Sequence, residues 1–130
     1  MMAINLTKGS VVARELRIAR NFIERFRGLI GSKPLADGDG FLIPHCQGIH
    51  TFGMSYDIDV IYLDRDGRIL AVYEALKPNR FAKVYFQSRF VLELPMGAIE
   101  RSRSNIGDTL HLISTQALSP SVLSLGALFS

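Results

Sequence analysis

The chain has little cysteine and no signal-like apolar segment at its start, and each shortage excludes a class of protein. Cys46 is the only cysteine among 130 residues, so no disulfide can form within the chain. A chain of this length nevertheless suits one domain, which can bury its own core without a disulfide or a structural metal. Residues 1–9 lack the apolar stretch of a secretory signal, and we therefore expect a cytoplasmic protein.

The carboxyl-terminal part is apolar but too interrupted for a membrane helix. No Asp, Glu, Lys or Arg follows Asp108, yet Pro120 and several serines break the apolar pattern. A membrane-spanning helix needs roughly 20 mostly apolar residues, so we expect no membrane span. We expect residues 114–130 to form an apolar tail. This tail covers the domain, pairs with a second copy to give a homodimer, or stays mobile.

Positive charge and phosphate-binding motifs are also scarce. Fifteen Lys and Arg against twelve Asp and Glu give a net charge of +3, and the basic residues are spread along the chain. A nucleic-acid-binding surface concentrates its basic residues on one face, so we expect no nucleic acid partner. The sequence contains neither GxGxxG nor GxxxxGK[ST], nor the GxSxG of a nucleophile elbow. We therefore expect no bound cofactor.

Turn residues separate short apolar segments along most of the chain, which is typical of β-proteins. Residues 10–19 alternate between apolar and charged side chains and predict one or two short strands. Further strands are expected at residues 41–43, 58–63, 68–73, 90–94 and 109–113. The sequence Asp-Arg-Asp-Gly at residues 64–67 predicts a hairpin turn, because glycine accepts a positive φ without strain.

One short helix is expected near residues 22–30. Asn21 followed by Glu24 has the spacing of a helix cap with its reciprocal carboxylate, and Gly31 can end the helix. Six to eight strands with one helix predict a mainly β fold with a minor α component, either a small antiparallel β-sandwich or a barrel. We expect a single domain spanning residues 1–130, with its core at about residues 10–113.

The segment 45–54 gathers the only cysteine and two of the three histidines. His45, Cys46 and His50 are the residue types that bind Zn²⁺, but their spacing is not that of a zinc finger. A fourth ligand would have to be water, a carboxylate such as Asp59, or a distant histidine. We therefore expect no metal. In the less favoured interpretation, in which a metal does bind, these three residues are its candidate ligands.

A cysteine nucleophile is a second interpretation of the same segment. Adjacent residues on a strand point to opposite faces, so Cys46 would pair with His50 rather than with His45. A neighbouring imidazolium lowers the pKa of a thiol and so generates the nucleophilic thiolate. The interpretation that we favour is that Cys46 packs as a small apolar side chain.

Three carboxylates each have a functional and a structural interpretation. Asp57 and Asp59 would share one face of a strand, where they could share a proton or bind a cation. We favour the alternative in which they cap a turn and accept hydrogen bonds from nearby amides. Glu93 lies within an apolar segment, so it either faces solvent at a sheet edge or is partly buried against a cation such as Arg27.

Several segments, taken in order, resemble the DUF192 family. They are Arg27-Gly28-Leu29, Gly40-Phe41, Ile49 to Met54, Ile58 to Ile61, Leu63-Asp64, Leu92 to Pro95 with Gly97, and Gly107-Asp108. The resemblance implies a compact, mainly β domain of sandwich or jelly-roll-like form. It implies no reaction, because the family is one of unknown function. Asp57 stands where a proline is common in the family, which makes the pairing of Asp57 with Asp59 peculiar to this chain.

We therefore expect a small binding or accessory domain whose ligand is a small molecule or a peptide. Its groove would be formed by His50, Phe52, Met54, Asp59, Glu93 and Arg27. One alternative is an enzyme that uses His50 with Asp59 or Glu93 for proton transfer, with or without a metal. Another is a structural subunit that dimerises through the tail. A histidine and a carboxylate that meet in an open pocket would favour the enzyme.

Overall fold

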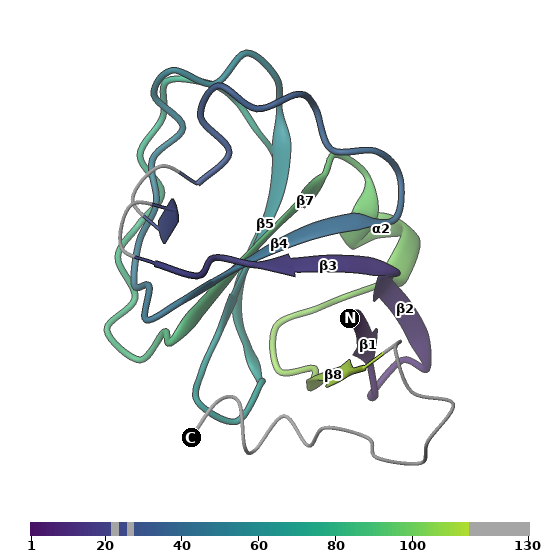
Figure 1. The fold of residues 1–130 in the computed structure, drawn as a ribbon. Helices are drawn as coiled ribbons and strands as arrows, with labels where there is room; N and C mark the ends of the chain where they lie inside the picture. Colours follow the sequence, from purple (N-terminus) through teal and green to yellow (C-terminus); the bar gives the residue numbers. More distant parts are fainter. Residues whose placement is uncertain (22–23, 26–27, 115–130) are drawn as a thin grey trace.

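The computed structural model describes residues 1–21, 24–25 and 28–114, and the strands within these ranges form two sheets (Figure 1). The strands are β1 (Met2–Asn5), β2 (Ser10–Ala13), β3 (Glu15–Ile18), β4 (Asp39–Pro44), β5 (Ile58–Leu63), β6 (Ile69–Leu76), β7 (Phe90–Pro95) and β8 (Leu110–Ile113), and the helix α2 spans Ala98–Ser102. The smaller sheet has the order β2-β1-β8 and the larger sheet the order β3-β4-β7-β5-β6. The mainly β fold predicted from the sequence is confirmed, and in this part of the chain the strands form two sheets rather than one closed barrel.

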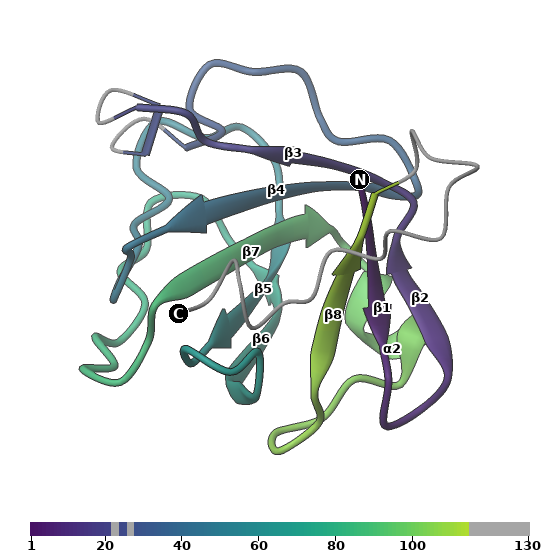
Figure 2. The same cartoon turned by 60° about the horizontal axis from the view of Figure 1, so that its bottom comes forward.

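The strands of the smaller sheet run across those of the larger sheet, as Figure 2 shows. β3 and β4 pair in parallel, whereas β7 pairs antiparallel with β4 and β5, and β5 pairs antiparallel with β6. The predicted hairpin between β5 and β6 is confirmed. In its turn Asp64 Oδ1 accepts hydrogen bonds from the N–H groups of Asp66 and Arg68, and Gly67 has a φ of +82°.

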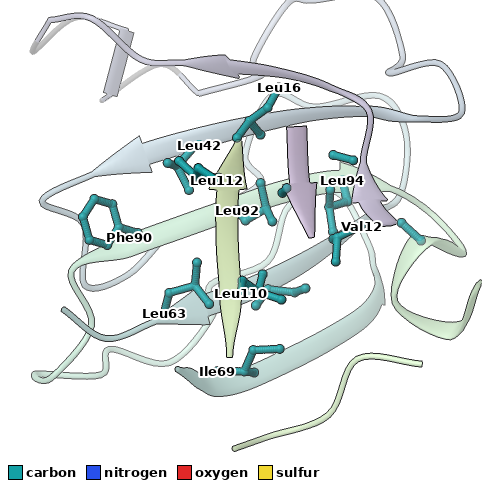
Figure 3. Close-up of a cluster of buried hydrophobic side chains, with 14 of the residues drawn as sticks. Val12, Leu16, Leu42, Leu63, Ile69, Phe90, Leu92, Leu94, Leu110 and Leu112 are labelled. Carbon is teal, nitrogen blue, oxygen red and sulfur yellow. The ribbon is translucent and has the colours of Figure 1, made fainter. Parts of the chain in front are cut away.

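Both faces of the larger sheet are covered, and β7 at its centre is buried along its whole length. On one face Phe90, Leu92 and Leu94 pack against apolar side chains of the smaller sheet, among them Leu110 and Leu112 (Figure 3). Alternate residues of a strand point to opposite faces, so Val91 and Glu93 point the other way. The second face is covered by loop residues, so any site on Glu93 must lie between the sheet and those loops.

Two elements were not predicted from the sequence. β1 pairs with both β2 and β8, and Ala3 within it is fully buried, so the core begins earlier than residue 10. α2 follows directly after β7, in a segment where the sequence suggested only the end of a strand. Gly97 precedes α2 with a φ of +96°, a conformation that glycine adopts without strain.

The predicted helix near residues 22–30 is described only in part. Within it Glu24 and Arg25 are helical, and Gly28 N–H donates to the carbonyl oxygen of Glu24 at 2.9 Å. The predicted cap is present, because Asn21 Oδ1 accepts a hydrogen bond from Glu24 N–H at 2.9 Å. The Glu24 carboxylate accepts a hydrogen bond from the N–H of Arg20 rather than from that of Asn21. The rest of this predicted helix lies outside the described residues.

The predicted apolar tail lies outside the described residues apart from its first residue, Ser114. Its role in dimerisation therefore stays a prediction. Of the helices that the described ranges contain, none has the length and apolar character that crossing a membrane requires.

Candidate functional site

A cavity of about 260 Å³ lies on the face of the larger sheet that the loops cover, and we call it the Glu93 cavity. Most of its lining is apolar and comes from Leu29, Ile30, Ile43, Ile49 and Met54, together with the backbone of two glycines. Its polar lining consists of three side chains, those of Arg25, His50 and Glu93. A mostly apolar cavity with a few convergent polar groups is typical of a ligand site.

Glu93 is buried because of its register in the sheet. Its neighbours across β7 are Phe41 on β4 and Val60 on β5, and both are buried apolar residues. Only 4% of Glu93 is exposed, and its Oε2 has no hydrogen-bond partner among the described residues. This burial raises the pKa of Glu93 to about 8, because the charged form loses its hydration. The carboxyl group therefore holds its proton at neutral pH.

Gly28 brings the backbone of the covering loop close to this carboxyl group. It has a φ of +55°, and a Cβ atom added to it would lie 3.1 Å from Glu93 Oε1. A larger residue would therefore strain the backbone and press on the carboxyl group. Sequence reasoning assigned no role to Gly28 or to Arg25. The only signal for Gly28 was its place in a segment shared with the DUF192 family.

His50 and Met54, two residues of the predicted groove, both line the Glu93 cavity. Between them Thr51 is fully buried, donating its hydroxyl to the carbonyl oxygen of Lys77 at 2.6 Å. The same hydroxyl oxygen accepts a hydrogen bond from the N–H of Arg80 at 2.9 Å. These two bonds fix the segment that carries His50 and Met54 against the loop after β6.

Phe52 lies outside the cavity lining, although it was predicted to line the groove. It is 41% exposed, and its ring contacts those of His50 and Phe81, with centroid distances of 5.5 Å and 4.7 Å. Phe81 is even more exposed and pairs with His50 in an isolated β-bridge. The aromatic rings therefore pack around the outer side of His50 rather than into the cavity.

Asp59 lies on the opposite face of the sheet from Glu93. In the register of β5 with β7, Val60 pairs with Glu93 and Asp59 pairs with Leu94, so the two carboxylates point in opposite directions. Asp59 is fully buried and accepts three backbone N–H groups, from Ala75 at 2.9 Å, Gly97 at 3.1 Å and Ile99 at 2.9 Å. We therefore remove Asp59 from the candidate site and assign it a structural role. The favoured prediction for Asp59, acceptance of nearby amides, agrees with these bonds.

Asp57 and Asp59 do not form a pair on one strand, because β5 begins at Ile58. The suggested cation or shared proton between them therefore has no basis in the sheet geometry. Glu93 is not at a sheet edge either, since β7 is the central strand of the larger sheet. Its suggested cationic partner Arg27 lies outside the described residues.

The cysteine does not have the environment of a nucleophile or of a metal ligand. Cys46 is half-buried and donates to the carbonyl oxygen of Gly48 at 3.2 Å. Burial raises the pKa of the Cys46 thiol, whereas a nucleophile needs a lowered one. His45 is exposed, and the described part of the chain contains no group of three His, Cys, Asp or Glu side chains placed to hold a metal ion.

Comparisons with known proteins point to a family without an assigned reaction. The DUF192 family model, described as "Uncharacterized ACR", matches residues 3–112. A UPF0127 protein of Thermococcus sibiricus is 34% identical over 113 residues, which cover 84% of this chain and 73% of that protein. A UPF0127 protein of Pyrococcus furiosus is 34% identical over 112 residues, which cover 83% of this chain and 95% of that protein.

The fold is also similar to that of a solved structure. A protein of unknown function from Novosphingobium aromaticivorans superimposes with a TM-score of 0.74 at 21% identity, covering 85% of this chain and 83% of that protein. At this identity the likeness supports the fold alone. What the site does must be argued from its own residues.

Proposed function

Because the chain belongs to the DUF192 family, which supplies no reaction, we propose from its own geometry that it is a small-ligand-binding domain whose site is the Glu93 cavity. The observation that carries this proposal is the buried Glu93 oxygen without a hydrogen-bond partner among the described residues. A buried polar atom is almost always hydrogen-bonded in a folded protein, so an exception calls for an explanation. A ligand that reaches this oxygen supplies the missing partner.

The size of the cavity supports a small molecule over a folded peptide. Its volume of about 260 Å³ is below the roughly 300 Å³ at which drug-sized pockets begin. A peptide would fit only by inserting one side chain or its terminus. The walls formed by Leu29, Ile43 and Met54 would contact an apolar part of the ligand, while its polar group would face Glu93.

A fragment screen by two-dimensional ¹H–¹⁵N NMR tests this proposal. We expect some small polar fragments to shift the amide signals of Gly28, Gly48, His50 and Glu93 together, because these residues line one cavity. The Gly28→Ala variant should lose the response. Gly9→Ala should keep it, since Gly9 also has a positive φ of +66° but a Cβ there would meet nothing within 4 Å. Fragments that shift none of these signals, or that act equally on both variants, would contradict the proposal.

A proton-transfer enzyme is the second candidate, and one observation favours it. Glu93 and His50 line the same cavity, and a carboxyl group with a pKa of about 8 suits a general acid at neutral pH. Asp59 has no part in this alternative. New product signals that form from a fragment with the wild type, but not with Glu93→Gln, would support the enzyme over the binding domain. A single domain and a cytoplasmic location stay proposals beside either function.

A further inference from the structure

We propose that the Glu93 cavity binds the ammonium group of a small primary amine with a short apolar chain, as an ion pair with the Glu93 carboxylate. This inference rests on the proposed binding function and names the chemical class of its ligand. It is carried by Glu93 Oε2, which has no hydrogen-bond partner among the described residues, and by the cavity that this side chain lines.

The described residues give Glu93 no cation. Their two ion pairs join Lys8 to Asp108 and Arg20 to Glu24, on other parts of the surface. Arg25 lines the same cavity, and its charge also acts on the thiol of Cys46, whose pKa is raised by burial despite that charge. Burial raises the pKa of Glu93, and no positive charge of the described residues opposes that rise. A positive charge that pairs with the Glu93 carboxylate must therefore come from outside the described residues.

An ammonium group suits this position better than a neutral polar group. A carboxylate only accepts hydrogen bonds, and an ammonium group carries three donors on one compact charged centre. Hydrogen bonds between charged partners are roughly twice as strong as those between neutral groups, and more so in a site without water. The backbone of Gly28 lies close to the other oxygen of this carboxyl group, Oε1, so a bulky donor has little room on that side.

The remaining walls determine the other part of the ligand. Leu29, Ile43 and Met54 are buried side chains whose surfaces face the cavity. Each methylene group that moves from water to such a wall strengthens binding roughly fourfold. Affinity should therefore rise along the series of n-propyl, n-butyl and n-pentyl amine, and fall once the chain exceeds the cavity.

Binding requires Glu93 to lose a proton. In the free protein near pH 7 the carboxyl group is protonated, and in the complex it is a carboxylate paired with R–NH₃⁺. The O–H bond of Glu93 breaks, the proton passes to the solvent, and no further reagent is needed. Affinity should therefore increase about tenfold per pH unit from about pH 6 to about pH 8. An alkylamine keeps its own charge over this range.

Other groups that face Glu93 must be separated from this effect. They are Arg25, His50 and Cys46, all from the covering loops, whereas the strand neighbours Phe41 and Val60 do not titrate. Burial raises the pKa of the Cys46 thiol, which therefore stays neutral in this range. A His50→Gln variant removes the remaining titratable group.

The experiment is an NMR titration of the full chain with n-butylamine, n-butanol and butyrate at about pH 6, 7 and 8. We expect n-butylamine to bind roughly tenfold or more tightly than n-butanol, and its affinity to rise with pH in the wild type and in His50→Gln. Glu93→Gln should bind the amine roughly tenfold or more weakly and without this pH dependence. Gly28→Ala should lose binding, and Gly9→Ala should match the wild type.

The outcomes separate the two proposals. If n-butanol or butyrate binds the wild type as tightly as the amine does, and if this binding is lost in Gly28→Ala, the cavity is a ligand site. The inferred ligand class is then wrong. An amine affinity that is unchanged in Glu93→Gln overturns the ion pair. If none of the three probes binds the wild type while a fragment in the wider screen does, the amine inference fails alone. If no fragment binds either, both proposals fail.

Discussion

Asp59 and Glu93 are both buried carboxylates of the larger sheet, but they lie on opposite faces and differ in their hydrogen-bond partners. Asp59 is 0% exposed and accepts three backbone N–H groups, which connect β5 to the end of β6 and to the start of α2. Glu93 is 4% exposed, and its Oε2 has no partner among the described residues. The two residues occupy neighbouring register positions, so burial alone does not distinguish them.

The comparison shows that the partners of a buried carboxylate indicate its role better than its burial does. Hydrogen bonds from backbone amides to a buried side chain stabilise a fold, and Asp59 accepts three of them. A buried carboxyl group without a partner destabilises the fold when it ionises, as Glu93 must at high pH. We infer that Asp59 serves stability, whereas Glu93 serves binding at a cost in stability.

The largest effect is expected from Asp59→Asn. One oxygen can still accept the N–H of Ala75, but the new amide group faces the N–H groups of Gly97 and Ile99 and cannot accept them. We expect a loss of about 4 kcal/mol in the free energy of unfolding, measured by urea denaturation. A loss below about 1 kcal/mol would contradict the structural role of Asp59.

Glu93→Gln should have the opposite effect at high pH. The folded pKa of about 8 lies above the ordinary value of 4.5, so between these values the folded state holds a proton that the unfolded state has lost. The stability of the wild type is therefore greatest below about pH 4.5 and falls as the pH rises towards about 8. We expect the variant to match the wild type near pH 5 and to exceed it by about 3 kcal/mol near pH 8. Denaturation at both values tests this, and a variant destabilised near pH 8 would contradict it.

Gly28→Ala tests whether the loop that contains Gly28 packs closely on the Glu93 carboxyl group. Both Gly28→Ala and the control Gly9→Ala place a side chain at positive φ, which costs about 1 kcal/mol each. Only the Cβ of Gly28→Ala would press on Glu93, at 3.1 Å from Oε1. We expect it to be less stable than the control by about 1 kcal/mol in parallel thermal unfolding. Equal losses would mean that the loop can move away from Glu93.

The smallest effect is expected from Phe52→Ala. This ring packs on His50 and Phe81 outside the cavity and is 41% exposed. Removing it should lower the free energy of unfolding by about 0.5 kcal/mol and change n-butylamine affinity less than threefold, or about 0.6 kcal/mol. A larger loss of amine affinity in the NMR titration would place the binding site around the aromatic rings instead of Glu93.

Local sequence patterns predicted most of the larger sheet, because its strands are separated by strong turn residues. The hairpin at residues 64–67 is an example, since Asp64 and Gly67 determine the turn with short-range interactions alone. β1 and α2 have only four and five residues, and each depends on distant partners. β1 pairs with β8 more than 100 residues away, and α2 begins on the carboxylate of Asp59. No local pattern could predict either element.

The candidate site was predicted in part for the same reason. His50, Met54 and Glu93 were identified by residue type, and all three line the cavity. Asp59 was grouped with them because sequence spacing does not reveal which strand positions are in register, and the register places it on the other face. Gly28 was missed because its closeness to Glu93 arises only when the loop folds over the sheet.

The most direct test of the central claim is a ¹³C NMR titration of the side-chain carboxyl carbons of the glutamates. The Glu93 signal is identified by its loss in Glu93→Gln. We predict that this carboxyl group titrates with a pKa of about 8 in the free protein and becomes ionised at neutral pH when n-butylamine is added. A pKa near 4.5 in the free protein would mean that Glu93 already has a partner, as the suggested pairing with Arg27 requires, and would contradict the account.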